Sequence, residues 1–111
     1  MTSDNAEQEM NQSCKDVAHI LKNLSHPSRL MILCLLAEGP ANVNVLTEKC
    51  GISQSAVSQF LARMRLQGIV EPERHGQHVY YKVSDPRILE LLLSLHRIFK
   101  PEEIKEKTYK I

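Results

Sequence analysis

Residues 52–68 read ISQSAVSQFLARMRLQG, and this stretch predicts the helix around which the rest of the chain is organised. Ser53 is a good N-cap, because its side-chain oxygen can accept a hydrogen bond from a free backbone N–H group of the first turn. Four apolar residues with helical spacing form one stripe that must be buried: Val57, Phe60, Leu61 and Met64. The opposite face is small or amide-bearing, with Ser55, Ser58, Gln59 and Ala62. Such a face suits a base edge in a major groove, although it is also typical of a solvated helix surface.

Composition restricts the class of protein. The 111 residues, 42% of them hydrophobic, predict one domain with a modest core. A net charge of +1 gives no overall basic character, so any nucleic-acid function must come from local clustering. The three cysteines form neither a Cys-x-x-Cys zinc motif nor a disulfide framework, and they are interpreted as reduced thiols. No apolar run approaches the ~20 residues that cross a bilayer, and no signal peptide is visible, so we expect a cytoplasmic protein without a membrane partner.

The N-terminal part predicts a tail and two helices. Residues 1–9 are polar and predict a disordered tail. Apolar residues then alternate in steps of four and three, which indicates a helix ending near Ser25 whose narrow stripe suits a partner helix: Met10, Cys14, Val17, Leu21 and Leu24. Residues 28–38, SRLMILCLLAE, are apolar on nearly every side and stop at Gly39-Pro40. They predict the central buried helix.

The middle of the chain predicts a helix-turn-helix followed by a hairpin. Asn42 caps a short third helix that Gly51 ends, and the Ser53 helix follows after about three residues, the helix-turn-helix arrangement. From Val70 the period changes to two, and residues 70–76 and 78–83 predict a β-hairpin with its tip near residues 75–77. Pro72 restricts the first strand to an edge of the sheet.

The last helix, ILELLLSLHRIF at residues 88–99, is apolar on two faces, one for the core and one for a second subunit. We therefore predict a mainly α fold with a small β-hairpin, a winged helix-turn-helix. Its DNA-binding and dimerisation domain would span residues 10–99, and its N- and C-terminal helices would join a homodimer. Residues 100–111 form a charged tail that adds a short helix or none.

Over roughly residues 15–99 the sequence resembles the ArsR/SmtB family of small dimeric bacterial repressors. Three blocks carry the resemblance: LSHPSRLMILCLL at 24–36, ISQSAVSQFLARMRLQGIV at 52–70 and RHGQHVYYKVSD at 74–85. The resemblance implies a winged-helix homodimer joined mainly through its first and last helices. It also implies a transcriptional repressor that binds double-stranded DNA at an inverted repeat.

Family members also sense a signal, and the metal-binding positions differ here. Metal-sensing relatives often carry Cys-x-Cys in the third helix, where this chain has Val43-Asn44-Val45. Others bind zinc through Asp and His on the last helix. Asp85 matches the first of those ligands, but Arg87 stands where a His is expected, and Ile98 and Pro101 occupy the later positions. We therefore predict no metal and no cofactor.

A closer resemblance is to the sulfide- and redox-responsive branch that includes BigR, YgaV and HlyU. One cysteine of that branch sits where Cys34 is, and the second follows the aromatic residue of the last helix. Here Phe99 is followed by Lys100, so half of the dithiol pair is missing. Cys34 is a candidate redox sensor, and the alternative is an inert small hydrophobic residue of the core. The effector is unknown.

The resemblance, together with residue chemistry, selects a set of DNA contacts. From the Ser53 helix we assign side chains to base edges and phosphates: Ser53, Gln54, Ser55, Ser58, Gln59 and Arg63. From the hairpin we assign Arg74, Gln77, His78 and Tyr80 to the minor groove or backbone. Leu66 is expected to pack against the hairpin. His75 and His78 have ligand-like chemistry but lack a third ligand.

Three other functions compete with a DNA-binding regulator. A winged helix can be a protein-interaction module without DNA binding, which would favour apolar or acidic groups on the exposed face of the Ser53 helix. A metal-responsive repressor is the second. An enzyme is least expected, because no Gly-rich phosphate loop and no nucleophile placed with a base is visible.

Overall fold

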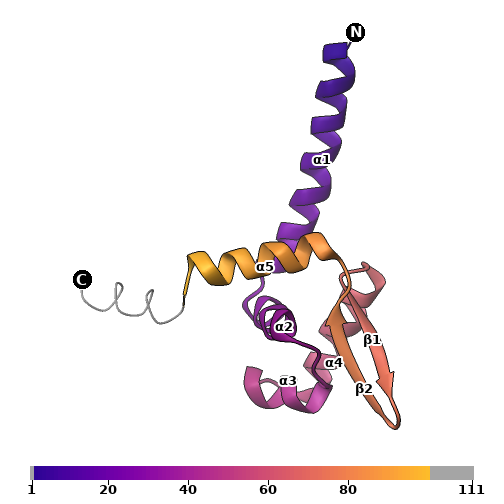
Figure 1. The fold of residues 1–111 in the computed structure, drawn as a ribbon, viewed down its shortest axis with the longest axis vertical. Coiled ribbons are helices and arrows are strands. Elements are labelled where there is room, and N and C mark those ends of the chain that lie inside the picture. Colours follow the sequence, from indigo (N-terminus) through magenta and orange to yellow (C-terminus); the bar gives the residue numbers. More distant parts are fainter. Residues whose placement is uncertain (1, 101–111) are drawn as a thin grey trace, which may run out of the picture. The chain divides into compact units, whose positions relative to one another are not determined.

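The computed structural model describes residues 2–100, in which five helices and one antiparallel hairpin follow each other along the chain (Figure 1). Their bounds are α1 Thr2–Leu24, α2 Pro27–Glu38, α3 Val43–Cys50, α4 Gln54–Leu66, β1 Val70–His75, β2 His78–Val83 and α5 Pro86–Ile98. This order confirms the predicted mainly α, winged helix-turn-helix fold. Within these residues no helix is long and apolar enough to cross a membrane. The tail from residue 101, for which a short helix was left open, lies outside the described residues.

The chain divides into two compact units, one up to Leu30 and one from Met31 onward. In the first unit α1 begins at Thr2, so the prediction of a disordered tail over residues 1–9 is wrong for the described part of that segment. Residues 2–9 contain no glycine or proline and include the good helix formers Ala6, Glu7 and Gln8. Asp4 lies in the first turn, where its negative charge stabilises the helix by interacting favourably with the helix dipole.

A buried asparagine holds the turn that follows α1. Asn23 is 4% exposed, and its Nδ2 donates to the backbone oxygen of His19 at 3.1 Å, while Arg29 Nη1 donates to Asn23 Oδ1 at 3.2 Å. The backbone N–H of Ser28 donates to His26 Nδ1 at 3.2 Å in the first turn of α2. These bonds satisfy polar groups that the turn would otherwise bury unpaired.

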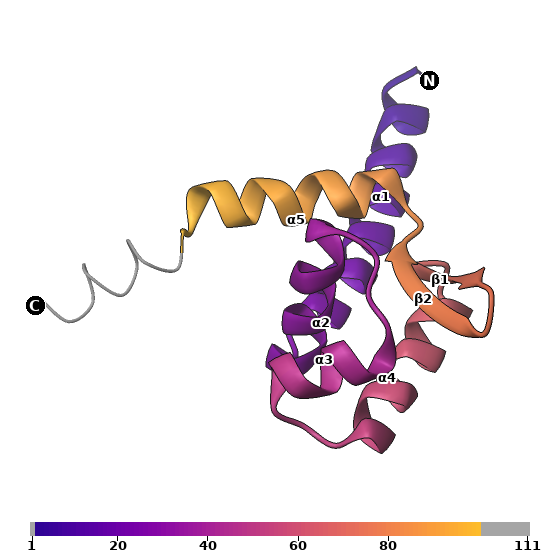
Figure 2. The same cartoon turned by 60° about the horizontal axis from the view of Figure 1, so that its bottom comes forward.

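The second unit is built around an apolar core to which every one of its elements except β2 contributes. The buried side chains are Ile32, Leu33 and Leu36 of α2, Leu46 of α3, Val57, Leu61 and Met64 of α4, Val70 of β1, and Ile88 and Leu92 of α5. The apolar stripe predicted for residues 52–68 is therefore the buried face of α4. Phe60, the remaining member of that stripe, is half-buried. Figure 2 shows α3 and α4 joined by their short turn, with the hairpin beyond the end of α4.

Caps fix the start and the end of α4. The N–H of Ala56 donates to Ser53 Oγ at 3.1 Å, and α3 before it is capped by Asn42 Oδ1 and ends at Gly51, as predicted. At the other end Gly68 has φ +75°, and the N–H groups of Gly68 and Ile69 donate to the carbonyls of Arg65 and Met64 at 3.0 and 2.9 Å. This is the Schellman pattern, which requires a left-handed residue and therefore favours glycine.

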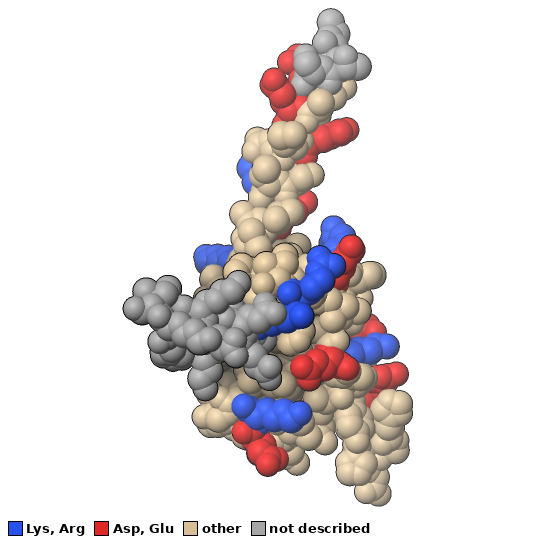
Figure 3. Space-filling view, turned by 60° about the vertical axis from the view of Figure 1, so that its left-hand side comes forward, with Lys and Arg blue, Asp and Glu red and all other residues tan. Residues whose placement is uncertain are grey.

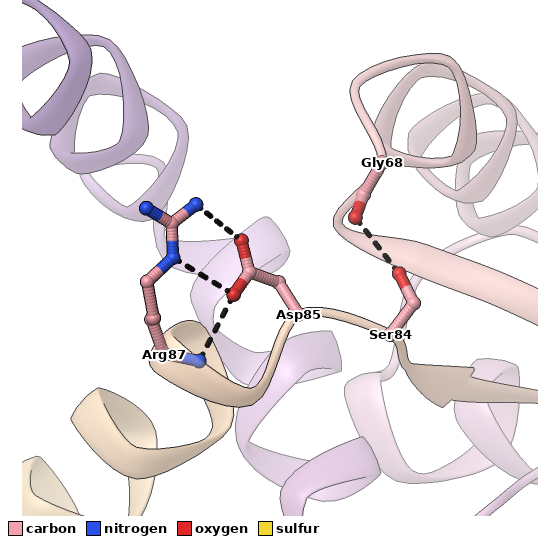
Figure 4. A network of polar contacts seen from close by, with 4 residues as sticks. All are labelled: Gly68, Ser84, Asp85 and Arg87. Atoms are coloured by element: carbon pink, nitrogen blue, oxygen red, sulfur yellow. Dashed lines mark hydrogen bonds and ion pairs between the residues drawn. The ribbon is translucent and has the colours of Figure 1, made fainter.

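The hairpin is attached to this cap through one serine. Ser84 follows β2; its hydroxyl donates to the carbonyl of Gly68 at 2.8 Å, and its N–H donates to the carbonyl of Ile69 at 2.9 Å (Figure 4). The end of α4 and the end of the hairpin are thus one hydrogen-bonded junction.

The register of the hairpin explains the position of Pro72. Strand β1 pairs with β2 from Val70↔Val83 to His75↔His78, and Gly76 at the tip has φ +65°. Tyr81 exchanges both of its backbone hydrogen bonds with Ala41, at 2.8 and 3.1 Å. Pro72, which lies opposite Tyr81, is therefore in a non-hydrogen-bonded pair, and its missing N–H costs no ladder bond.

Asp85 caps α5 directly after this junction. Its Oδ1 accepts from the N–H of Arg87 at 2.9 Å and from Arg87 Nε at 3.2 Å, and its Oδ2 accepts from Arg87 Nη2 at 2.8 Å (Figure 4). The hydrogen bonds from Arg87 hold the pKa of the Asp85 carboxyl below its ordinary value. The carboxylate is therefore the stable form in the folded protein at neutral pH.

Replacing Asp85 with alanine should lower the free energy of unfolding by about 1 kcal/mol, because it removes an N-cap. Asp85→Asn keeps a side-chain oxygen for the Arg87 N–H and should lose less. Urea titrations followed by circular dichroism at one protein concentration measure both. The pKa of the Asp85 carboxyl is lowered in the folded protein, so the stability that its carboxylate contributes is lost as the pH falls through that pKa. The difference in the free energy of unfolding between wild type and Asp85→Asn should therefore become smaller in acid. Equal stability of all three proteins at pH 7 would contradict this role.

Candidate nucleic-acid interface

The face of α4 opposite the core carries the polar side chains that were predicted from the sequence to contact DNA. Four of them, Gln54, Ser55, Ser58 and Gln59, are exposed, as are Ser53 before the helix and Arg63 one turn later. In the described part of the chain the side chains of Ser55, Ser58 and Gln59 have no hydrogen-bond partner. Their donors and acceptors are therefore available to an external ligand.

The first turn of α4 adds backbone donors. Ser53 is occupied as the cap, and the first intrahelical bond runs from the N–H of Val57 to the carbonyl of Ser53 at 3.1 Å. The N–H groups of Gln54 and Ser55 precede that bond and point out of the helix end. A helix N-terminus of this kind favours a phosphate oxygen.

The pleat of the hairpin, which is the wing of the fold, places the residues predicted to contact DNA on two different faces. Arg74 pairs with Val79 and lies on the same face as Pro72 and Tyr81, whereas His78 and Tyr80 lie on the other face. Gln77 is exposed in the turn. The structure thus brings His78 and Tyr80 together and places Arg74 apart from them.

The face with His78 and Tyr80 also holds His75 and three charged residues that the sequence alone did not single out, Glu71, Glu73 and Lys82. Lys82 Nζ lies 3.4 Å from Glu71 Oε1 and 3.9 Å from Glu73 Oε1, and His75 Nε2 lies 3.5 Å from Glu73 Oε2. The rings of His75 and Tyr80 meet edge to face at 5.5 Å. The period of two in the sequence of this segment already indicates that these side chains share one face of the hairpin. Because Lys82 is paired with two glutamates, it has less charge to offer a phosphate than Arg74 has.

The prediction that Leu66 packs against the hairpin is wrong, because this side chain is 90% exposed. The core side of the junction is closed by Ile69 and Val70, which are 3% and 1% exposed. Leu66 lies seven residues after Gln59 and therefore extends the polar face of α4 with one apolar side chain.

Acidic and basic side chains are interspersed on the face that Figure 3 draws, in keeping with the net charge of +1. Basic side chains near the polar face of α4 are Arg63 and Arg65, both exposed. The interface therefore relies on local cations and neutral hydrogen-bonding groups.

The sequence also predicted a candidate redox thiol at Cys34, and it left a metal-responsive repressor as an alternative. Among residues 2–100 no three His, Cys, Asp or Glu side chains are grouped so that they could hold a metal ion. Cys14 is exposed, whereas Cys34 and Cys50 are half-buried. Burial, and then the negative charge of Glu38, raise the pKa of the Cys34 thiol. A raised pKa lowers the thiolate fraction and so slows reaction with oxidants.

The chain is similar to known regulators over most of its length. A family profile described as "Bacterial regulatory protein, arsR family" matches residues 26–72. The biofilm growth-associated repressor of Xylella fastidiosa (strain Temecula1 / ATCC 700964) is 38% identical over 96 residues, which cover 86% of this chain and 84% of the repressor.

Solved structures agree with this similarity. Reduced HlyU from Vibrio cholerae N16961 has a TM-score of 0.77 at 34% identity, and the match covers 83% of this chain and 97% of that one. The homodimeric winged helix-turn-helix DNA-binding domain Mb0332 from Mycobacterium bovis has a TM-score of 0.68 at 27% identity, with 87% and 89% covered.

The electrostatic environment of Cys34 can be tested by alkylation. Glu38→Gln should speed the reaction of Cys34 with iodoacetamide at pH 8, because removing the carboxylate lowers the thiol pKa and raises the thiolate fraction. Peptide mass spectrometry gives the rate at each cysteine separately. Cys50 is the internal control, since burial alone raises the pKa of its thiol. An unchanged rate at Cys34, or an equal change at both, would refute the effect of Glu38.

Proposed function

The chain belongs to the ArsR family of bacterial regulatory proteins, and we propose that this DNA-binding transcriptional regulator reads its operator with the exposed face of α4. The observation that carries the proposal is that Ser55, Ser58 and Gln59 are exposed, unpartnered and on the side of α4 opposite its buried stripe. A helix presenting such groups fits the major groove.

The chemistry of this face divides into two tasks. Gln59 and the serine hydroxyls can both donate and accept, which suits base edges. Arg63 and the free N–H groups at the start of α4 suit phosphates, which position the helix without reading sequence. Since neutral groups predominate on this face, its side chains are better suited to reading base edges than to neutralising phosphates.

The hairpin supplies a second contact, and its two faces differ. Arg74 has no ion-pair partner within residues 2–100, whereas Lys82 faces two glutamates. Arg74 is therefore the principal phosphate contact of the wing. Gln77, His78 and Tyr80 are weaker candidates, because they offer no permanent charge.

The regulator acts as a homodimer on an inverted repeat. Met10, Val17 and Leu21 of α1 and Leu93 of α5 are all about half exposed or more, so apolar faces on both terminal helices are available to a second copy. Two α4 helices related by a two-fold axis enter successive major grooves about 34 Å apart. Action on genomic DNA makes the protein cytoplasmic.

A thiol-directed signal through Cys34 is the effector response that we propose, by analogy with the redox-responsive branch and its relative named reduced HlyU. The half-buried thiol with a raised pKa favours a slow response to strong or persistent oxidants. A metal response has less support, because the described residues hold no cluster of ligands. A protein-interaction module would need a more apolar α4 face than one exposed leucine, Leu66, supplies.

Replacing both Ser58 and Gln59 with glutamate should weaken binding about a hundredfold or more, because base contacts worth about 1–3 kcal/mol each are lost and carboxylates face phosphates. The probe is a duplex selected by the wild-type protein from a random-sequence pool, and fluorescence anisotropy at fixed salt gives the affinity. Lys49→Glu, which changes the net charge equally at an exposed position of α3, should weaken binding far less. Unchanged affinity of the double variant, or loss of its dimer, would refute the assignment of this face.

Arg74→Ala should reduce the slope of log affinity against log salt by about 1 for each wing that contacts DNA, because one phosphate contact per protomer is lost. Lys82→Ala, which removes a cation already paired with Glu71 and Glu73, should leave that slope nearly unchanged. The same anisotropy assay over a series of salt concentrations measures both. Equal slopes for wild type and Arg74→Ala would remove Arg74 from the interface.

A further inference from the structure

The apolar side chain at the end of α4 takes no part in the core. Leu66, the last residue of the helix, is 90% exposed, the highest value among the large hydrophobic side chains of residues 2–100. A single exposed leucine needs no explanation in itself. The position of this one is informative, because it stands on the face of α4 that we assign to DNA.

Helical periodicity sets Leu66 in line with the side chains that face away from the core. Ser55, Gln59, Ala62 and Leu66 follow each other at intervals of four, three and four residues, and all four are exposed. They form one row along α4, polar at its start and apolar at its end. The buried side chains of the same helix lie on its opposite side.

Leu66 is suited to contact the same surface as the middle of this row. The preferred rotamers of a helical leucine direct its side chain back over the preceding turn, which is toward Ala62 and Gln59. The small side chain of Ala62 leaves room for a surface to lie along the row between them. A groove that receives Gln59 therefore also receives the methyl groups of Leu66.

The charges at this end of α4 permit its approach to DNA. The carbonyl end of a helix carries partial negative charge, which repels phosphates. Arg63 and Arg65 lie in the last turn and are both exposed, so they offset this charge beside Leu66. One leucine among arginines is too small an apolar surface for a protein partner, and the neighbouring cations favour a polyanion.

We propose that Leu66 determines specificity by contacting the C5-methyl group of a thymine in the major groove, an inference that rests on the proposed reading of DNA by α4. This methyl group is the one apolar substituent that the base pairs present in that groove. Opposite a G·C pair the leucine would cover donors and acceptors without replacing their hydrogen bonds to water, which is unfavourable. Leu66 therefore selects a thymine at one position of each half-site.

Removing the methyl group from the DNA tests this contact. The duplex selected by the wild-type protein is remade with deoxyuridine in place of thymine, one position at a time in both half-sites, and anisotropy at fixed salt gives the affinities. At one position the wild-type protein should lose about fifteenfold, because one buried methyl group contributes about fourfold in each half-site. Leu66→Ala should bind the thymine and uracil duplexes of that position within about twofold of each other.

Controls on both sides of the interface accompany this measurement. Leu66→Met keeps an apolar side chain of similar volume and should retain the preference for thymine. Thymines elsewhere in the duplex should give the same ratio for wild type and Leu66→Ala. Because Leu66 is exposed and leucine and alanine both favour helices, Leu66→Ala should also unfold at the wild-type urea midpoint.

The outcomes separate this inference from the proposed function. Loss of the methyl effect at a single position in Leu66→Ala supports the thymine contact. The contact is overturned if Leu66→Ala binds the thymine duplex as tightly as wild type, or if it is weakened equally on thymine and uracil duplexes. In both cases the reading of DNA by α4 stands, provided that the double variant at Ser58 and Gln59 loses binding. A wild-type protein that enriches no duplex from the pool overturns the proposed function itself.

Discussion

The hydrogen-bonded junction at Gly68 is the constraint on which the geometry of the DNA-binding unit depends. The cap formed by the N–H groups of Gly68 and Ile69 ends α4, and Ser84 then ties the return strand to the same two residues. Because these bonds join three segments within a few ångströms, α4 cannot rotate about its axis without moving the hairpin. The rotation of α4 about its axis decides which of its side chains face a DNA groove. The junction therefore determines which residues of α4 can contact bases.

Most of the fold followed from local patterns in the sequence. The caps at Asn42 and Ser53, the apolar stripe of α4 and the change to a period of two at Val70 each depend on neighbouring residues, and each was predicted. The start of α1 was not predicted, because a polar segment without glycine or proline is compatible with both a disordered tail and a helix. The exposure of Leu66 was missed because it depends on how the chain leaves α4 through Gly68, a tertiary matter.

The candidate site shows the same division. The exposed face of α4 is the complement of its buried stripe, so helical periodicity alone located Ser55, Ser58 and Gln59. In the hairpin the alternation was recognised, yet Arg74 was grouped with His78 and Tyr80 although the register sets them on opposite faces. The ion pairs around Glu73 and Lys82 depend on that register, and a list of charged residues along the chain does not reveal which of them neutralise each other.

The position of Pro72 has a consequence for the solution behaviour of the protein. The hairpin is only two strands wide, and Ala41 already occupies the free edge of β2, which leaves the outer edge of β1 as the one open edge of this sheet in the described structure. Pro72 interrupts that edge, since it offers no N–H to an incoming strand. In the absence of DNA the hairpin can therefore remain exposed to solvent, with little tendency to pair with strands of other molecules and aggregate.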